Sequence, residues 1–194
     1  MRKFRFTTPS GIEVTRSISK VPYKKGLRGL LEQLDTHRGF YLSSGYEYPV
    51  RYSRWDIASV CPPLEIVAVG RRVEFRPLNA RGRMLLEILM PVIEPNPHWE
   101  SVVYEQCALC GTLKQPAALF TEEERSKQPS AFSILRALIE EFRSGGDARL
   151  PLVGAFGYDL LFRFDPIQTR LERGKQKDLH LYFCDDIYYM DRMK

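Results

Sequence analysis

Hydrophobic and polar residues alternate at the start of the chain, where Phe4, Phe6, Ile12 and Val14 are separated by polar neighbours. Alternation with a period of two is typical of half-buried β-strands. Residues 8–11 between them read Thr-Pro-Ser-Gly, which is a turn sequence. The pattern therefore predicts a β-hairpin at the beginning of the chain.

Helical spacing replaces this alternation in three segments. The first has Pro22 as its first helical residue and should end near residues 37–39. The second covers 84–89, where Pro91 should stop it because proline lacks the backbone donor that a helix needs. The third follows Ser130 and should end at the Ser-Gly-Gly of residues 144–146. Thr121 and Glu124 have the spacing of a capping box and indicate a further helix start.

Runs rich in β-branched and aromatic residues predict the remaining strands. They cover residues 40–44, 52–60, 64–69, 73–78, 99–107, 152–158 and 179–189. Gly70 and Arg71 should form a tight turn, and residues 62–63, both proline, belong in a loop or at a sheet edge. Helices and antiparallel-looking strands without a β-α-β rhythm predict an α+β fold, with residues 1–194 as one domain.

Composition excludes several classes of protein. The chain has 194 residues, of which 44% are hydrophobic and 27% charged, as in an ordinary globular protein. Its net charge of +5 comes from scattered Lys and Arg that carboxylates interrupt, so we expect no nucleic-acid partner. No stretch approaches the roughly 18 apolar residues of a membrane span, and the first residues lack a signal peptide's apolar region. We therefore expect no membrane association and a cytoplasmic location, with the four cysteines reduced.

The sequence contains no complete catalytic or metal-binding motif. Cys107 and Cys110 have half the spacing of a zinc site, but no second pair follows, and we expect them in a strand and its following turn. The histidines are far apart, and no serine or cysteine has a nucleophile-elbow context. Residues 154–159 are glycine-containing but match neither dinucleotide nor P-loop patterns, which favours close backbone packing where a strand becomes a helix. We therefore predict no catalytic residue, no metal site and no cofactor in this chain.

Residues 41–55 form the most informative segment. They concentrate hydroxyl groups, aromatic rings and two arginines, Arg51 and Arg54, at one strand-loop-strand junction. Such a junction suits a small zwitterion: hydroxyls and backbone groups bind the ammonium, an arginine binds the carboxylate and aromatic walls hold an apolar side chain. An ordinary packed hairpin is the alternative that these residues leave open.

The same segment carries a family resemblance. Residues 34–39, 43–44, 46–49 and 51–56 together resemble the amino-terminal region of anthranilate synthases, in particular the fused bacterial type with its glutamine amidotransferase on the same chain. Further similarities follow in the same order, at residues 120–127, 135–137, 154–160 and 185–187. The resemblance therefore spans nearly the whole chain.

The resemblance implies an activity and a regulatory site. Anthranilate synthases convert chorismate and glutamine-derived ammonia into anthranilate, pyruvate and glutamate on the way to tryptophan. This region is expected to build part of a mostly antiparallel two-sheet β core with flanking helices, and to hold the site for feedback tryptophan. The family signature there is Leu-Leu-Glu-Ser with a basic residue about ten positions later. Leu42, Ser43 and Ser44 match its last three positions, Arg54 matches the basic one, and Ser43 replaces the usual glutamate.

The resemblance also implies what the chain lacks. The chorismate-binding residues, the magnesium-binding glutamates and a second wall of the tryptophan pocket belong to a carboxy-terminal half. We therefore expect residues 1–194 to be inactive alone. The expected partners are L-tryptophan, a chorismate-binding domain, a glutamine amidotransferase domain or subunit, and a second copy in a homodimer. A stand-alone amino-acid sensor and a segment of aminodeoxychorismate synthase are the alternative functions.

Overall fold

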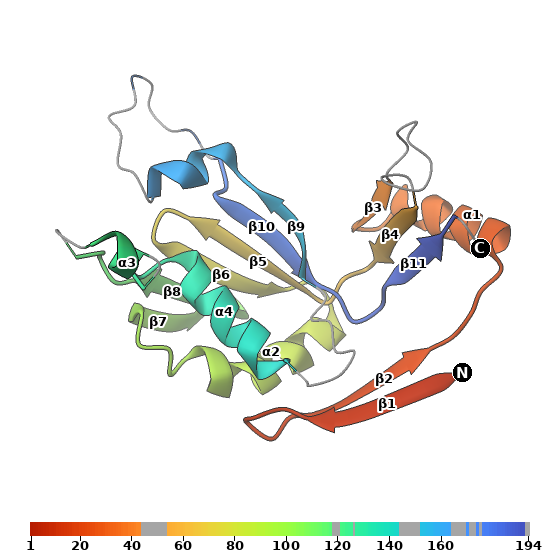
Figure 1. Ribbon diagram of the computed structural model, residues 1–194, viewed down its shortest axis with the longest axis horizontal. Coiled ribbons are helices and arrows are strands. Elements are labelled where there is room, and N and C mark those ends of the chain that lie inside the picture. Colours follow the sequence, from red (N-terminus) through yellow and green to blue (C-terminus); the bar gives the residue numbers. More distant parts are fainter. Residues whose placement is uncertain are drawn as a thin grey trace.

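The protein is α+β, as the sequence predicts, and its described strands form three antiparallel sheets (Figure 1). The computed structural model describes residues 1–43, 54–117, 121–125, 127–143, 152–163, 170, 174 and 176–192. A six-stranded sheet forms the larger body, a three-stranded sheet lies beside it, and a separate hairpin runs below both in the view of Figure 1. None of the helices in these described ranges is long and apolar enough to cross a membrane.

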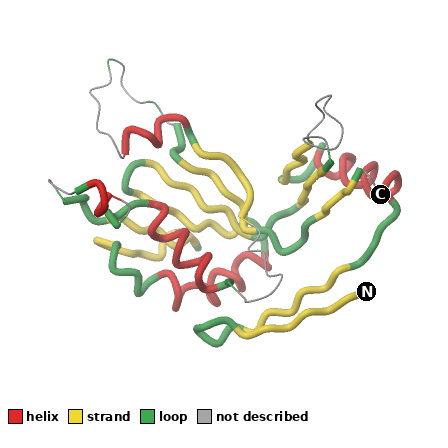
Figure 2. Tube along the Cα trace, in the orientation of Figure 1, coloured by secondary structure: helices red, strands yellow, loops and turns green. Residues whose placement is uncertain are grey.

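The six-stranded sheet carries the main hydrophobic core. Its strands, in the order β7-β8-β6-β5-β10-β9, are β5 (Leu64–Val69), β6 (Arg72–Pro77), β7 (Trp99–Glu105), β8 (Ala108–Leu113), β9 (Leu152–Phe156) and β10 (Leu179–Phe183). Two helices, α2 (Ala80–Ile93) and α4 (Ala131–Glu141), pack on one face, as Figure 2 shows. Their apolar stripes meet alternate strand residues such as Ile66 and Phe75, which have no exposed surface. Two short helices, α3 (Glu122–Arg125) and η1 (Tyr158–Arg163), complete this body.

The three-stranded sheet has the order β11-β4-β3 and contains β3 (Gly39–Ser43), β4 (Trp55–Val60) and β11 (Tyr188–Asp191). Helix α1 (Tyr23–Leu34) packs beside it, with Leu30 only 2% exposed. Gly39 allows this approach, because a Cβ atom there would overlap the Ser59 carbonyl oxygen and lie 2.6 Å from the Leu34 side chain. The small sheet is therefore fixed to α1 at the beginning of β3.

The predicted amino-terminal hairpin consists of β1 (Arg2–Thr7) and β2 (Glu13–Ile18), with Gly11 in the turn at a φ of +92°. Its tip contacts the end of α4, where Glu141 accepts hydrogen bonds from the Ser10 backbone N–H at 3.1 Å and from the Ser10 hydroxyl. Burial alone would raise the pKa of Glu141, but the hydrogen bonds from Ser10 and Thr8 lower it below its ordinary value. A buried, ionised carboxylate thus fastens the hairpin to the larger body.

The predicted strand over residues 179–189 is wrong as a single element. The chain forms β10 in the large sheet, leaves it after Phe183 and enters the small sheet as β11 at Tyr188. The Ser59 hydroxyl fixes the connection by donating to the Asp186 carbonyl oxygen at 2.7 Å. Asp185 and Asp186 lie at the break, and the prediction carried a single strand through them.

Three other predictions about element boundaries are corrected by the structure. Helix α2 continues through Pro91 to Ile93, because Leu89 and Ile93 are buried and their packing outweighs the lost hydrogen bond. Pro22 precedes α1 as its cap and is not its first helical residue. Cys107 lies in a turn that comes before β8, and Cys110 lies inside that strand, which the sequence analysis did not predict. The expected end of the third helix at residues 144–146 falls outside the described residues.

Candidate functional site

Antiparallel pairing of β3 with β4 brings the predicted site residues to one end of the small sheet. Ser43 is the cross-strand partner of Asp56, and Leu42 is the partner of Ile57. Arg54 immediately precedes β4 at the same end. Ser44, the fourth predicted residue, lies outside the described residues. The structure therefore places three of the four predicted residues close together in the fold.

Asp56 is a buried carboxylate at the centre of this end, and its role here was not predicted from the sequence. Its side chain is 0% exposed, and Tyr41 Oη donates to its Oδ2 at 3.1 Å. Arg192 also donates from Nε to Oδ2 at 2.9 Å. The Arg192 Nη2 atom lies 2.8 Å from Asp56 Oδ1 and forms an ion pair with it. The same Nη2 atom donates its hydrogen bond to Ser43 Oγ. Among the described residues, Asp56 Oδ1 therefore has no hydrogen-bond donor.

Asp56 remains ionised at neutral pH. Burial alone would raise its pKa, but hydrogen bonds from Arg192, Ser43 and Tyr41 lower that pKa below its ordinary value. A charge pair of this kind is costly to break by removing one partner, because the other charge then stays without a counterion. The cluster of Tyr41, Ser43, Asp56 and Arg192 therefore joins β3, β4 and the residue after β11.

Arg54 already binds a carboxylate in the structure. Its Nε donates to Asp191 Oδ1 at 3.2 Å and its Nη2 donates to Asp191 Oδ2 at 2.9 Å. The guanidinium carbon lies 4.9 Å from the centroid of the Trp55 ring, within the range of a cation–π contact. The hydrogen bond from Arg54 to Asp191 raises the pKa of Arg54, which is therefore permanently charged. Arg54 thus has the paired, parallel geometry with which arginine recognises carboxylates.

The opposite face of the small sheet is apolar and exposed. Leu42 and Tyr189 flank Ile57 in the strand register, and Trp55 lies two residues away on the same face. The exposed fractions are 50% for Leu42, 48% for Trp55 and 47% for Tyr189. Leu42 and Ser43 therefore point to opposite faces, so a single ligand pocket on the Asp56 face would not include the Leu42 side chain.

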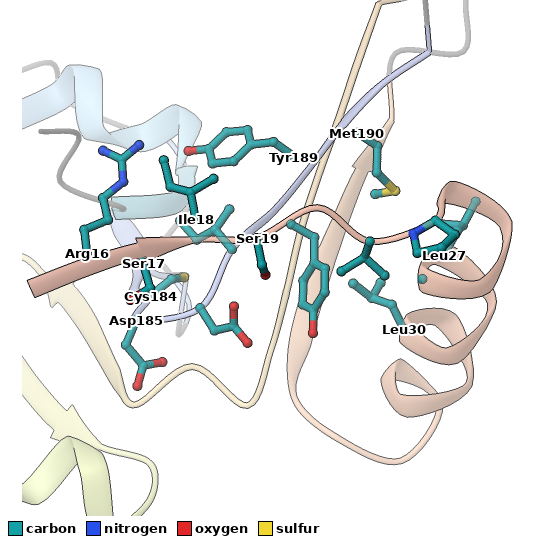
Figure 3. A pocket seen from close by; sticks show the side chains of 16 residues that line it. Arg16, Ser17, Ile18, Ser19, Leu27, Leu30, Cys184, Asp185, Tyr189 and Met190 are labelled. Carbon is teal, nitrogen blue, oxygen red and sulfur yellow. The ribbon is translucent and has the colours of Figure 1, made fainter. Parts of the chain in front are cut away.

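A separate cavity of about 380 Å³ lies between the end of β2, helix α1 and the segment that leads into β11 (Figure 3). Its walls include Ser17, Ser19, Leu27, Leu30, Asp185 and Met190. Neither Ser43 nor Arg54 lines it. Sequence patterns did not reveal this cavity because it joins segments more than 150 residues apart.

The cysteines do not form a reactive centre in the described part of the chain. Cys184 is fully buried, and burial raises its pKa to about 11, so the neutral thiol dominates at physiological pH. Burial likewise raises the pKa of Cys110, whereas Cys107 is exposed. The described residues contain no group of three or more His, Cys, Asp or Glu side chains that could hold a metal.

The glycine-containing segment at 154–159 packs closely against β10, as the sequence predicts. A Cβ atom on Gly154 would overlap the His180 carbonyl oxygen, and one on Gly157 would overlap that of Lys177. The strand β9 ends at Phe156 and the 3-10 helix η1 begins at Tyr158. The glycines thus serve backbone packing at a strand-to-helix junction.

A second buried carboxylate lies on the face of the large sheet that is turned away from α2 and α4. Glu65 is 1% exposed, between Leu64 and Ile66, whose side chains enter the core. Its Oε2 lies 2.8 Å from His180 Nε2, and its Oε1 accepts from Arg76 Nη1 at 2.8 Å. Both oxygens are engaged, so Glu65 is a structural anion and not a free base.

Two anthranilate synthases are similar to the chain. The anthranilate synthase of Azospirillum brasilense is 37% identical over 192 residues, which are 98% of this chain and 26% of that protein. Anthranilate synthase component 1 of Vibrio cholerae is 24% identical over 179 residues, which are 91% of this chain and 34% of that protein. No family profile matches the chain. The chain therefore spans 26% to 34% of the length of these curated relatives. It belongs to the anthranilate synthase family and corresponds to a partial, amino-terminal region of those proteins.

Proposed function

We propose that the chain is the amino-terminal segment of an anthranilate synthase that acts on chorismate and glutamine-derived ammonia. The observation that carries this proposal is the 37% identity over 98% of the chain. The second relative matches nearly the same extent, and its name also refers to anthranilate synthase. The segment would serve tryptophan biosynthesis as part of a larger catalytic assembly.

The segment contributes a structural scaffold, and the reaction takes place in the remaining polypeptide. The two best-connected carboxylates of the described region, Asp56 and Glu65, are both held by arginines and have no free access to a substrate. The exposed apolar face around Ile57 supports contact with further polypeptide, since side chains such as Leu42 and Trp55 lose water when they are covered. The segment alone is therefore inactive, and a chorismate-binding domain and a glutamine amidotransferase are its partners.

Feedback tryptophan binds at the end of β3 and β4. Arg54 is the residue that binds the tryptophan carboxylate. Its guanidinium lies over the Trp55 ring and forms paired hydrogen bonds with a carboxylate, that of Asp191. Ser43 cannot supply the charge of the family's glutamate, so backbone carbonyls and Ser44 take the ammonium. Leu42 lies on the same face of the sheet as Trp55 and Asp191, the two residues that Arg54 contacts.

A chimera tests the proposed function. The region of the Azospirillum brasilense enzyme that aligns with this chain is replaced by residues 1–194, and anthranilate is measured by its fluorescence with chorismate, magnesium and ammonia. We expect the chimera to form anthranilate, whereas the Azospirillum protein without that region and residues 1–194 alone do not. A chimera that is soluble and shows a cooperative thermal transition but forms no anthranilate would overturn the proposal.

A further inference from the structure

Asp191 occupies the place on Arg54 that a ligand carboxylate would take. Two parallel hydrogen bonds, of 3.2 Å and 2.9 Å, join the guanidinium edge to both carboxylate oxygens. This fork geometry is the one with which arginine binds free carboxylates, and the guanidinium offers it only along a few edges. The Trp55 ring covers one side of the same guanidinium. An incoming carboxylate therefore meets an arginine whose binding edge already holds Asp191.

The pair is placed so that it can exchange partners. Arg54 is 44% exposed and Asp191 is 11% exposed, so water and ligands reach the arginine from outside. Exposed ion pairs are weak and open frequently, because solvent screens the charges and two side chains must be held in one geometry. Release of Asp191 is therefore compatible with an otherwise unchanged fold.

Arg192 holds the end of β11 against β4 when Asp191 releases Arg54. Its backbone N–H donates to the Arg54 carbonyl oxygen at 2.9 Å, and its side chain is paired with the fully buried Asp56. Besides the strand pairing, two side-chain ion pairs join this end of β11 to β4: the Arg192–Asp56 pair, whose carboxylate is buried, and the more exposed Asp191–Arg54 pair. Only the more exposed pair competes with a ligand.

We propose that Asp191 is an internal competitor for the carboxylate of the effector at Arg54 and thereby sets the affinity of the tryptophan site. This inference rests on the proposed function, because it takes Arg54 as the carboxylate-binding residue. A ligand that binds only the open form has an apparent dissociation constant raised by the reciprocal of the open fraction. For an exposed pair, this effect is about two- to sixfold.

Calorimetric titration of the Azospirillum brasilense chimera, which supplies the second wall of the pocket, with two ligands tests the competition. L-tryptophan carries the carboxylate, whereas L-tryptophanamide keeps the indole and the ammonium and lacks it. We expect Asp191→Asn to bind tryptophan about two- to sixfold more tightly than the wild type and the amide with unchanged affinity. The gain should vanish when Arg54→Ala is added. Glu100→Gln, which removes the same charge from the exposed Arg71 pair, should change neither affinity.

The outcomes separate the competition from the proposed site. If the wild type binds tryptophan and Asp191→Asn binds it equally or less tightly, the competition is wrong and the site at Arg54 still stands. If Asp191→Asn raises the affinity for tryptophan and for tryptophanamide alike, the ligand carboxylate is not the group that competes with Asp191. If neither protein binds tryptophan at millimolar concentration while both melt cooperatively, the tryptophan site at Arg54 is wrong, and the competition with it.

Discussion

Ser43 and Asp56 are direct partners across β3 and β4, and Arg192 contacts both of them. Directly opposed residues of an antiparallel pair have Cβ atoms only about 4.5–5.5 Å apart. A glutamate at position 43, the commoner residue of the family signature, would therefore place a second carboxylate beside a fully buried one. Serine at this position accommodates Asp56 by accepting a hydrogen bond from the arginine that neutralises it.

This relationship predicts that Ser43→Glu destabilises the chain by about 1–2 kcal/mol, because two carboxylates would then share one arginine. Urea denaturation followed by circular dichroism measures the loss. Ser43→Ala is the matched control and should cost less, since it removes one hydrogen bond without adding a charge. A Ser43→Glu variant as stable as the wild type would show that the two side chains do not approach each other.

Removal of the Asp56 carboxylate should be more damaging. Asp56→Ala leaves Arg192 without its buried counterion, and we expect a loss of about 2–3 kcal/mol, less than for a fully buried pair because Arg192 is 31% exposed. The urea midpoint measures this effect. Glu100→Gln breaks the exposed Arg71 pair and should change the free energy of unfolding by less than about 0.5 kcal/mol. Equal effects of the two variants would contradict the role of Asp56 as a buried anchor.

Acid should release the amino-terminal hairpin from α4. The pKa of Glu141 is lowered from its ordinary value of 4.5, so its stabilising contact is present above that value and is lost as pH falls through the lower folded-state pKa. Hydrogen exchange of residues 2–18 should therefore be unchanged between pH 7 and about pH 5.5, once corrected for the intrinsic rate, and should accelerate below about pH 4.5.

Glu141→Gln is the control for this pH effect. The amide cannot ionise, so protection of the hairpin should be weaker at neutral pH and should no longer change with acid through this contact. The role of Glu141 would be refuted by a variant whose hairpin shows the same protection and the same acid-induced loss as the wild type.

Two glycine substitutions distinguish packing from conformational freedom. Gly154→Ala should destabilise the chain by about 1–3 kcal/mol, because its Cβ would overlap the His180 carbonyl oxygen of the neighbouring strand. Gly29→Ala, in the middle of α1 with no atom within 4 Å of the added Cβ, should be neutral or stabilising by up to about 1 kcal/mol. Thermal melting compares both. A Gly154→Ala variant with wild-type stability would reopen the question of why this segment contains glycine.

Local patterns were sufficient for elements whose signals lie within a few residues. The hairpin around Gly11, the apolar stripe that buries Leu30 and the turn at Gly70 all follow from short-range periodicity and turn chemistry. The continuation of α2 through Pro91 does not follow from short-range patterns, because it depends on the burial of Ile93 against the large sheet. The division of 179–189 into two strands depends on Ser59, far away in the chain.

The candidate site shows the same limit. Family resemblance selected Ser43 and Arg54, and strand pairing brings them to one end of the sheet. Their partners Asp191 and Arg192 lie more than 130 residues later and carry no motif, so only the pairing of β11 with β4 identifies them. The role of Asp56 could not be predicted for another reason. A carboxylate at a polar position of an alternating strand has the pattern of a solvent-facing residue.

We propose that this chain supplies the tryptophan-sensing region of an anthranilate synthase. The most direct measurement is the initial rate of anthranilate formation by the Azospirillum brasilense chimera as L-tryptophan is increased. We expect the rate to fall with rising tryptophan and Arg54→Ala to shift this inhibition to higher concentrations. A folded, active chimera whose rate is the same at every tryptophan concentration, or whose inhibition is unaffected by Arg54→Ala, would contradict it.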